Sequence, residues 1–437
     1  MQNNKEKVGL IWFKNNLRVF DNRALTKACE DNEVVIAAYF FNPDDYRKTH
    51  WGFPKTGKYR LKFLLESLDV LQTDLQQLKI PLLIAVEKPE IGIKQMVKDL
   101  GISNIYTQNE WTAEEHLIIK KVKKQTGIPV NLFYDQFLIH PDDLPFTDPG
   151  DVPDVFTRFR KICEKSWQVL PPIPAPPPMK RSVVLENFRS SIPSPKELGL
   201  DPAVPDPRSA FPFTGGSTAA LERIDHYFWR SKKLGFYKRT RNGLVGADYS
   251  SKLSPWLANG SISARYIYEE VKKFEKQEIK NQDTYWLIFE LLWRDYFKYI
   301  SMKYGNEIFS LGGILNRDYE WENNEDRFEE WSAGKTGNDF VDANMLELLH
   351  TGWMSNRGRQ NVASYWAKEL RQDWRKGAAW FEAMLIDYNV HSNWGNWMYA
   401  SGVGNDPRDR KFNTKTQAER YDKNGAFRKR WLQHSLF

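Results

Sequence analysis

Proline is concentrated in one stretch of this chain, and that stretch separates two parts of different character. Of the 23 prolines among the 437 residues, 16 lie between positions 141 and 212, and positions 171–178 read PPIPAPPP. Such a run favours extended polyproline geometry and forms neither a helix nor a central strand. We therefore expect a long surface connector over 141–216, between a first domain over 1–140 and a second over 217–437.

Apolar runs alternate with helical patterns before the connector. Short apolar segments predict buried strands at 8–13, 34–40, 81–86 and 104–108. Apolar residues at helical spacing predict helices over 55–78, 91–100 and 113–126. This alternation indicates an α/β domain with a doubly wound parallel sheet, which binds ligands at the carboxyl ends of its strands. No GxGxxG motif follows the first strand, so the usual dinucleotide-binding mode is not expected.

The part after the connector has a helical pattern throughout. Its apolar residues recur every three or four positions, and no strong strand pattern is present. We expect Gly305, Gly352 and Gly377 to supply helix stops or bends. The sequence thus predicts an all-α C-terminal domain.

The charge of the chain is unevenly distributed. Residues 1–150 contain 20 basic and 20 acidic residues, so the rest carries 43 against 36, which is the whole net charge of +7. A basic excess in one part favours a polyanionic partner for that part, although a solvated surface gives the same count.

Cysteine usage and hydropathy indicate the compartment. The two cysteines, Cys29 and Cys163, lie far apart without a CxxC motif, so neither a disulfide framework nor a metal site is expected. No apolar stretch approaches 18 residues, and the chain starts with a polar segment. We expect a soluble, cytoplasmic, monomeric protein that does not act at a membrane.

One helical segment carries charge in an apolar setting. In ELLWRDYF, residues 290–297, Glu290 and Arg294 are four residues apart and nearly all their neighbours are apolar or aromatic. The two side chains form either a surface ion pair or the polar contacts of a bound cofactor inside a buried helix.

Further segments resemble, in order and spacing, the flavin-site signatures of the photolyase/cryptochrome family. They are LIWFKNNLRVFDNRAL (10–25), DYSSKLSPWLANGSISAR (248–265), GKTGNDFVDANMLELLHTGWMSNRGRQ (334–360) and DWRKGAAWFEAMLIDYNVHSNWGNW (373–397). The segments FTRFRKICE (156–164) and GVGNDPRDRKFN are similar to those of the DASH branch. The resemblance implies an α/β domain and an all-α domain that encloses non-covalent FAD.

The resemblance also implies which residues contact the flavin. The loop 250–254 offers hydroxyls and backbone N–H groups to the pyrophosphate, and Arg359 with Asp387 corresponds to an ion pair beside the isoalloxazine. Asn393 matches the residue that faces flavin N5, and Asn389 stands where the family usually has Asp. The expected contacts are Tyr237, Ser250, Ser251, Lys252, Leu253, Ser254, Glu290, Arg294, Asn356, Arg359, Asp387, Asn389 and Asn393.

Tryptophans match the family's electron relay and substrate pocket. Trp397, Trp374 and Trp321 correspond to the relay that photoreduces flavin, and each also suits a core position. Trp293 matches a residue that stacks on the substrate. Tyr399 and Gln360 stand where enzymes acting on duplex DNA carry Trp and Met, and Gln360 with Asn356 disfavours (6-4) repair.

The resemblance assigns further residues to DNA and to an antenna. Arg241, Arg357 and Arg410 match positions of DNA phosphate contact. The segment QNEWTAEE (108–115) is similar to the family's acidic antenna segment, with Glu110, Glu114 and Glu115 as candidate contacts for 5,10-methenyltetrahydrofolate.

The resemblance therefore implies a light-driven enzyme. FADH⁻ would donate an electron to a cyclobutane pyrimidine dimer. Single-stranded DNA would be the preferred substrate, because a pocket with Tyr399 and Gln360 offsets less of the free-energy cost of flipping the dimer out of a duplex. A blue-light sensor that binds DNA with little repair is the alternative, and signalling members commonly carry a C-terminal extension, which the end at Phe437 leaves no room for. A nucleic-acid-binding module without turnover is a third reading.

Overall fold

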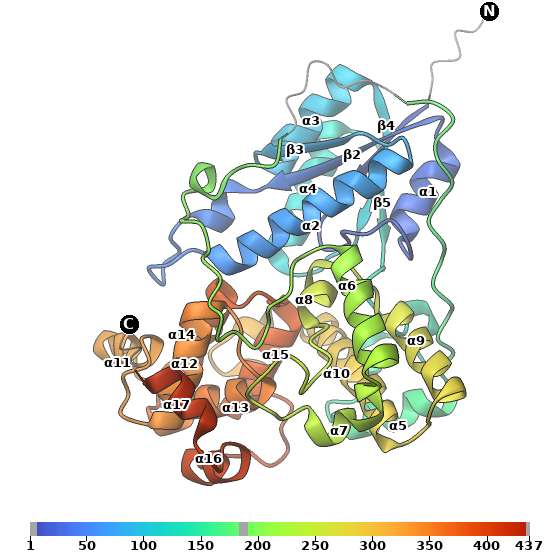
Figure 1. Ribbon diagram of the computed structural model, residues 1–437. Helices are drawn as coiled ribbons and strands as arrows, with labels where there is room; N and C mark the ends of the chain where they lie inside the picture. Colours follow the sequence, from blue (N-terminus) through green and yellow to red (C-terminus); the bar gives the residue numbers. More distant parts are fainter. Residues whose placement is uncertain (1–6, 183–190, 434–437) are drawn as a thin grey trace, which may run out of the picture.

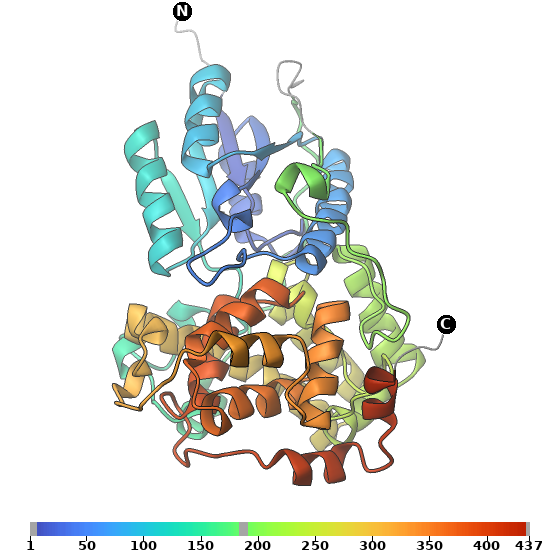
Figure 2. The same cartoon turned by 90° about the vertical axis from the view of Figure 1, so that its left-hand side faces the viewer.

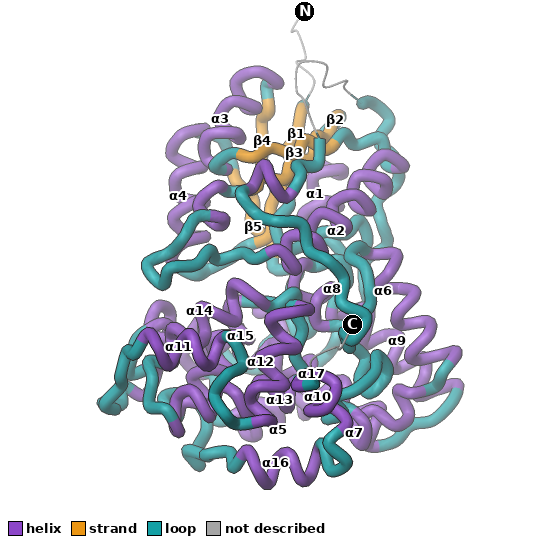
Figure 3. Tube along the Cα trace, turned by 60° about the vertical axis from the view of Figure 1, so that its left-hand side comes forward, coloured by secondary structure: helices purple, strands orange, loops and turns teal. Residues whose placement is uncertain are grey.

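The computed structural model describes residues 7–182 and 191–433. Its strands all lie in the N-terminal part and its C-terminal part is helical, as Figure 1 and Figure 3 show. The α/β and all-α fold predicted from the sequence is confirmed. Within the described residues, no helix has the length and apolar character needed to cross a membrane.

Five parallel strands form the sheet, in the order β3-β2-β1-β4-β5. Their bounds are β1 Val8–Trp12, β2 Val34–Phe41, β3 Leu82–Val86, β4 Ile102–Gln108 and β5 Val130–Phe133. The first four match the predicted strands. The sequence interpretation missed β5, whose four residues are only half-buried. Since β1 lies between β2 and β4, the strand order reverses there, and the crevice beyond the carboxyl ends of β1 and β4 is the ligand-binding position of such a sheet.

Helices cover both faces of the sheet. They are α1 Arg23–Asp31, α2 Lys58–Gln77, α3 Pro89–Leu100 and α4 Ala113–Thr126. Apolar residues of α1 and α2 share one core with the sheet, and those of α3 and α4 share the other, on its opposite face. The predicted helices are therefore confirmed, and α1 is an additional one.

The connector is extended along the α/β domain for much of its length and is drawn in green in Figure 1. Ile173 exchanges two hydrogen bonds with Asp21, and Met179 N donates to Leu78 O at 2.9 Å. Before this extended part the connector forms a helix, α5 Phe156–Ser166, whose Phe156, Phe159 and Cys163 are buried. That helix packs against the helical domain.

The helical domain is built around one large apolar core. Its helices are α6 Ser217–Ile224, α7 Tyr237–Thr240, α8 Ser254–Asn259, α9 Ala264–Gln277, α10 Gln282–Tyr304, α11 Glu325–Ser332, α12 Asp339–Thr351, α13 Asn356–Ser364, α14 Trp374–Met384, α15 Val390–Ser401, α16 Thr414–Tyr421 and α17 Ala426–Leu432. Gly305 and Gly352 end α10 and α12, as expected. Gly377 does not: it lies inside α14, where it makes room for a neighbouring ring.

Buried contacts join the two domains, which lie one above the other in Figure 2. Trp111, just after β4, stacks on His391 of α15 with ring centroids 4.4 Å apart, and its Nε1 donates to Ser301 Oγ at 2.8 Å. Phe137, Leu138 and Ile139, which follow β5, belong to the core of the helical domain. The backbone N–H groups of Leu138 and Ile139 donate to Asp295 of α10 at 2.8 and 2.9 Å.

Candidate functional site

The loop before α8 holds a buried cation. Lys252 is 2% exposed, adopts a φ of +62°, and places Nζ over the rings of Tyr249 and Trp353, 3.3 and 4.5 Å from their centroids. Its Nζ has no hydrogen-bond partner, and burial lowers the pKa of Lys252 well below its usual value. A buried ammonium without a partner is costly. The loop is therefore suited to an anionic ligand group such as the pyrophosphate of FAD.

Arg223 of α6 fixes the backbone of this loop. Its Nε donates to Ser251 O at 3.0 Å, its Nη2 donates to Ser250 O at 2.9 Å, and its Nη1 pairs with Asp248 at 2.6 Å. Arg223 is 3% exposed, so these contacts are made inside the protein. The sequence interpretation missed Arg223, because it lies some 30 residues before the loop in a helix with no motif of its own. Ser254 begins α8 immediately after the loop.

A buried carboxyl group accompanies Lys252. Glu347 of α12 is 1% exposed, and neither of its carboxylate oxygens has a hydrogen-bond partner. Burial raises the pKa of Glu347 to about 8, against the opposing charges of Lys252 and Arg359. Among the described residues, neither the buried amino group of Lys252 nor the buried carboxyl group of Glu347 has a hydrogen-bond partner. The sequence interpretation did not single out Glu347.

The structure brings Arg359 and Asp387 together, as the resemblance implied. Arg359 Nη2 donates to both carboxylate oxygens of Asp387, at 2.9 and 3.0 Å, and Arg359 Nε donates to Met354 O. Asp387 is only 3% exposed in its side chain. The pair fixes α13 against the turn between α14 and α15, which also carries Asn389.

Asn389, at the end of that turn, and Asn393, within α15, both form hydrogen bonds with nearby backbone groups. Asn389 caps α15 by accepting a hydrogen bond from Ser392 N at 3.2 Å, a role that aspartate fills equally well. Asn393, one turn later, donates from Nδ2 to Ala378 O of α14 at 2.9 Å. Because the amide N–H is bound, the orientation of Asn393 is set before any ligand arrives. Asn356, by contrast, starts α13 with an exposed side chain.

Glu290 and Arg294 do not pair with one another. Arg294 donates to the backbone oxygens of Gln136 and Leu257, which joins α10 to the α/β domain and to α8. Glu290 pairs instead with Arg241, at 2.7 Å. Burial raises the pKa of Glu290, and Arg241 opposes that shift. Tyr237 of α7 is buried nearby, and burial, followed by the charge of Glu290, raises its pKa.

The three arginines assigned to DNA each contact a pocket residue. Arg241 binds Glu290, as described above. Arg357 Nη1 donates to Gln360 Oε1 at 2.8 Å. Arg410 Nη2 donates to the hydroxyl of Tyr399, also at 2.8 Å. Each arginine therefore contacts a residue that the resemblance assigns to the flavin or the substrate site.

Two aromatic rings, those of Phe156 and Tyr399, pack against Trp293 from different directions. Trp293 of α10 stacks on Phe156 of α5, with centroids 3.7 Å apart and planes at 15°. Tyr399 of α15 meets Trp293 nearly at a right angle, with centroids 6.0 Å apart and planes at 89°. Phe156 orients the indole from within the connector. The sequence interpretation gave Phe156 no such role, although the segment FTRFRKICE that contains it had been singled out.

The three tryptophans assigned to the relay lie on different elements around α14. Trp397 packs on Gly377, where an added Cβ would lie 2.3 Å from its Cη2 atom, and Trp374 starts the same helix one turn earlier. The segment of Trp321 reaches the start of α14 through Glu322, whose N–H donates to Arg371 O and whose carbonyl accepts from Asp373 N. Trp374 and Trp397 are buried, whereas Trp321 is half-buried. Two of the three indoles are therefore interior and the third is partly exposed.

A cleft of about 700 Å³ opens between the two domains, at the carboxyl ends of β1 and β4. Glu110, Glu114 and Glu115 all line it, as does Asn389 from the helical domain. Glu110 accepts from Gln108 Nε2 at 2.6 Å and Glu114 pairs with Lys55. Burial and then the charge of Glu110 raise the pKa of Glu115 to about 8. The three acidic candidates thus belong to one cleft.

Two family profiles and several known proteins match this chain. The family profile of the FAD-binding domain of DNA photolyase matches residues 286–435, and that of DNA photolyase matches residues 9–178. Cryptochrome DASH of Gloeobacter violaceus is 47% identical over 98% of the chain and 85% of its own length. Cryptochrome DASH of Danio rerio is 46% identical over 96% of the chain and 82% of its own length.

Solved structures show the same likeness. The crystal structure of the Synechocystis cryptochrome superimposes with a TM-score of 0.93 at 45% sequence identity. The match covers 99% of this chain and 89% of the Synechocystis chain. A class III photolyase from Agrobacterium tumefaciens has a TM-score of 0.83 at 27% identity, with 98% and 87% covered. Profile matches at both ends and identities above 40% over nearly the whole length leave one assignment: the chain belongs to the photolyase/cryptochrome family, in its cryptochrome DASH branch, and its C-terminal domain is a FAD-binding domain.

Proposed function

We propose that this protein is a light-driven enzyme that opens cyclobutane pyrimidine dimers, preferentially in single-stranded DNA. The observation that carries the proposal is the right-angled pair of Trp293 and Tyr399, accompanied by three arginines that each bond a residue assigned to the flavin or the substrate site. Two planes at 89° suit two joined bases better than one flat base, and the arginines suit the phosphates on either side.

Reduced FAD, when bound, supplies the light-excited electron that splits the dimer and takes it back afterwards. The protein holds the reactants in place around that chemistry. Lys252 and the loop that Arg223 fixes would bind the pyrophosphate, and Arg359 with Asp387 would border the ring system. Asn393, anchored on Ala378 O, presents its amide oxygen at one fixed position.

The strand preference follows from the pocket. In a duplex the dimer must be flipped out, which costs a few kcal/mol. Stacking on an aromatic residue contributes about 1–3 kcal/mol per base. Tyr399 offers a smaller face than an indole, and its hydroxyl is held by Arg410. The pocket therefore recovers less of the flipping free energy, whereas a single-stranded dimer needs no flipping.

The test is the repair rate per absorbed photon of pre-reduced protein on three matched substrates. We expect clear repair of single-stranded DNA and of a dimer in an unpaired bubble, and weak repair of intact duplex. Tyr399→Trp should raise duplex repair relative to single-stranded repair, whereas the control Tyr399→Phe, which keeps the ring size, should not. Equal rates on all three substrates would refute the strand preference. Absence of repair on every substrate would leave the light sensor as the surviving function.

We also propose that the interdomain cleft holds a folate antenna. A carboxyl group with a pKa of about 8, as in Glu115, is protonated at neutral pH and can donate a hydrogen bond to a pterin ring while Glu110 accepts one. Protein loaded with 5,10-methenyltetrahydrofolate should show energy transfer to flavin in its fluorescence excitation spectrum. Glu115→Gln should retain the folate and Glu115→Lys should lose it. Equal retention by both variants would remove Glu115 from the site.

A further inference from the structure

Tyr319 lies beside the outermost tryptophan of the relay. Its ring centroid is 5.6 Å from that of Trp321, with the planes at 80°. Both side chains are half-buried and lie on the segment that precedes α11. Trp321 Nε1 is buried and has no hydrogen-bond partner among residues 7–182 and 191–433. An oxidised Trp321 therefore has no base to which its own N–H could pass a proton, whereas a second oxidisable ring is in contact with it.

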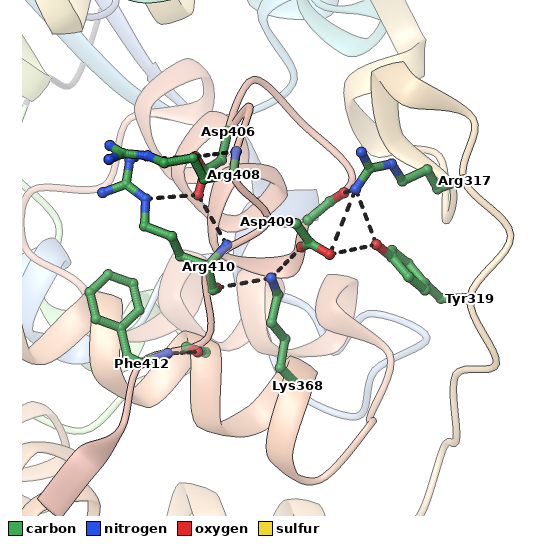
Figure 4. Close-up of polar contacts among 10 residues, drawn as sticks. Arg317, Tyr319, Lys368, Asp406, Arg408, Asp409, Arg410 and Phe412 are labelled. Carbon is green, nitrogen blue, oxygen red and sulfur yellow. Dashed lines mark hydrogen bonds and ion pairs between the residues drawn. The ribbon is translucent and has the colours of Figure 1, made fainter.

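Tyr319 has the base that Trp321 lacks. Its hydroxyl donates to Asp409 Oδ2 at 3.0 Å and accepts from Arg317 Nη1 at 3.1 Å, as Figure 4 shows. Lys368 Nζ bonds to the other oxygen of Asp409. Burial acts to raise the pKa of Asp409, but the bonds from Lys368 and Tyr319 and the charge of Arg317 together hold it below its usual value. Asp409 is therefore a carboxylate at neutral pH.

We infer that Tyr319 is the terminal electron donor of the relay and that Asp409 accepts its proton. This inference rests on the proposed flavin site and on the relay through Trp397, Trp374 and Trp321. The terminal oxidant is photo-excited oxidised flavin, whose missing electron is passed along the tryptophans to Trp321. One electron then leaves Tyr319 for the Trp321 radical cation, and the phenolic proton moves to Asp409.

The products are neutral Trp321, a neutral Tyr319 phenoxyl radical and protonated Asp409. A thiol reductant in solution closes the cycle by giving Tyr319 an electron, and Asp409 returns the proton. A phenol that loses an electron becomes a strong acid, so its oxidation needs a base within hydrogen-bond reach. The 3.0 Å contact to Asp409 supplies that reach. Since the radical is neutral after proton loss, the back reaction needs both particles to return.

The chain offers a matched control for the local chemistry. Tyr304, at the end of α10, donates to Asp154 Oδ1 at 2.6 Å, and Lys303 Nζ bonds the same oxygen at 2.8 Å. Here too a tyrosine hydroxyl bonds an aspartate that also bonds a lysine. Among the described residues, however, the Tyr304 ring packs on none of Trp321, Trp374 and Trp397. A signal from any tyrosine–aspartate pair would depend on Tyr304 as much as on Tyr319.

The experiment is electron paramagnetic resonance of the FAD-loaded full chain, frozen during illumination, with a thiol-driven photoreduction assay in parallel. We expect a tyrosyl radical in the parent protein and in Tyr304→Phe. Tyr319→Phe should lose it and retain a tryptophan radical, with slower photoreduction. Asp409→Asn leaves the Tyr319 ring and an acceptor oxygen in place but removes the carboxylate that takes the proton. This variant should also lose the tyrosyl radical. Only a tryptophan radical in the parent protein, or a tyrosyl signal that survives Tyr319→Phe, would overturn the inference.

Repair by chemically pre-reduced protein separates this inference from the proposed function. It bypasses the relay, so Tyr319→Phe and the parent protein should repair dimers equally well. A Tyr319-dependent radical in a protein that repairs nothing would refute the proposed repair function alone. Repair without such a radical would refute the terminal donor alone.

Discussion

Arg359 and Asp387 are joined through a single guanidinium nitrogen, which lies 2.9 and 3.0 Å from the two carboxylate oxygens. The aspartate side chain is 3% exposed and the arginine side chain 24%. Neutralising the aspartate leaves a largely buried guanidinium without its counter-charge. The stability of the FAD-free protein therefore depends on this pair, and so do the electrostatics of the flavin site proposed above.

We expect Asp387→Asn to lower the free energy of unfolding of the FAD-free protein by about 1–3 kcal/mol, the cost of an unsatisfied buried charged group. Loss of the negative charge should also raise the midpoint potential of bound flavin. Urea denaturation and a redox titration measure the two effects. Asp201→Asn, at an exposed aspartate of the connector, is the control and should change neither. An unchanged potential in Asp387→Asn would place the pair away from the flavin ring.

Lys252→Met should change the stability of the empty protein and its affinity for FAD in opposite directions. The variant removes a buried, unpartnered ammonium, so the FAD-free protein should unfold at a higher temperature. The same change removes the cation for the pyrophosphate, so the dissociation constant for FAD should rise. Lys252→Arg, which keeps the charge, is expected to retain affinity. Parallel loss of stability and affinity in Lys252→Met would mean that the lysine is satisfied without a ligand.

Glu347 predicts a pH dependence of stability. Its pKa rises from 4.5 to about 8 on folding, so in this interval the folded protein binds a proton that the unfolded chain releases. The stability contributed by this proton is full below pH 4.5 and is lost as the pH rises toward 8, with a slope of at most about 1.4 kcal/mol per pH unit. Glu347→Gln should remove that slope from the FAD-free protein.

The control for Glu347 is Glu329→Gln, at an exposed glutamate of α11. Chemical denaturation of the parent protein and both variants across this pH range gives the comparison. Other buried carboxyl groups contribute to the parent profile, so the difference between variant and parent carries the result. Superimposable profiles for Glu347→Gln and the parent protein would show that Glu347 is ionised when folded.

Gly377→Ala should disturb Trp397. An added Cβ would lie 2.3 Å from Cη2 and 2.7 Å from Cζ3 of the indole, so the ring or α14 must move. Overpacking of this kind costs about 1–3 kcal/mol, partly offset by the better helix propensity of alanine. In a Trp397→Phe background the smaller ring should relieve the clash. Denaturation of both single variants and the double variant measures this coupling, and strict additivity would contradict it.

Trp397→Phe alone should separate photoreduction from repair. Phenylalanine keeps an aromatic ring against Gly377 but is much harder to oxidise than an indole. Light-driven flavin reduction with an external thiol should therefore slow strongly, whereas dimer repair by chemically pre-reduced protein should be nearly unchanged. Absorbance of flavin under illumination and chromatography of repaired oligonucleotide give the two rates. Equal photoreduction by variant and parent would exclude Trp397 from the relay.

Periodic and local features of the fold were readable from the sequence. Four apolar runs became β1 to β4 because helices cover both faces of the parallel sheet, which leaves most residues of these strands buried. The edge strand β5 escaped because Val130–Phe133 is short and half-buried. Gly377 was expected to supply a helix stop or a bend, and it ends no helix: it lies inside α14 against the Trp397 ring, a requirement that has no local signature in the sequence.

The site was readable residue by residue but not in its contacts. Arg359 and Asp387 were paired through the resemblance, whereas the partner of Glu290 is Arg241, the residue after α7, rather than Arg294 one turn away. No spacing rule connects two helices that only tertiary packing brings together. The same holds for Arg223 on the loop 250–254 and for Phe156 against Trp293.

The core of the helical domain contains Phe137, Leu138 and Ile139 from the end of the α/β domain, and Phe156, Phe159 and Cys163 from α5. The FAD-binding domain therefore cannot be moved to another protein as a separate unit. A gene fragment that starts at residue 217 would encode every helix from α6 onward but leave a groove where these apolar side chains belong. An exchange of α/β domains between relatives therefore has to leave this stretch with the helical domain that it packs against, so the workable fusion junction lies upstream of residue 137.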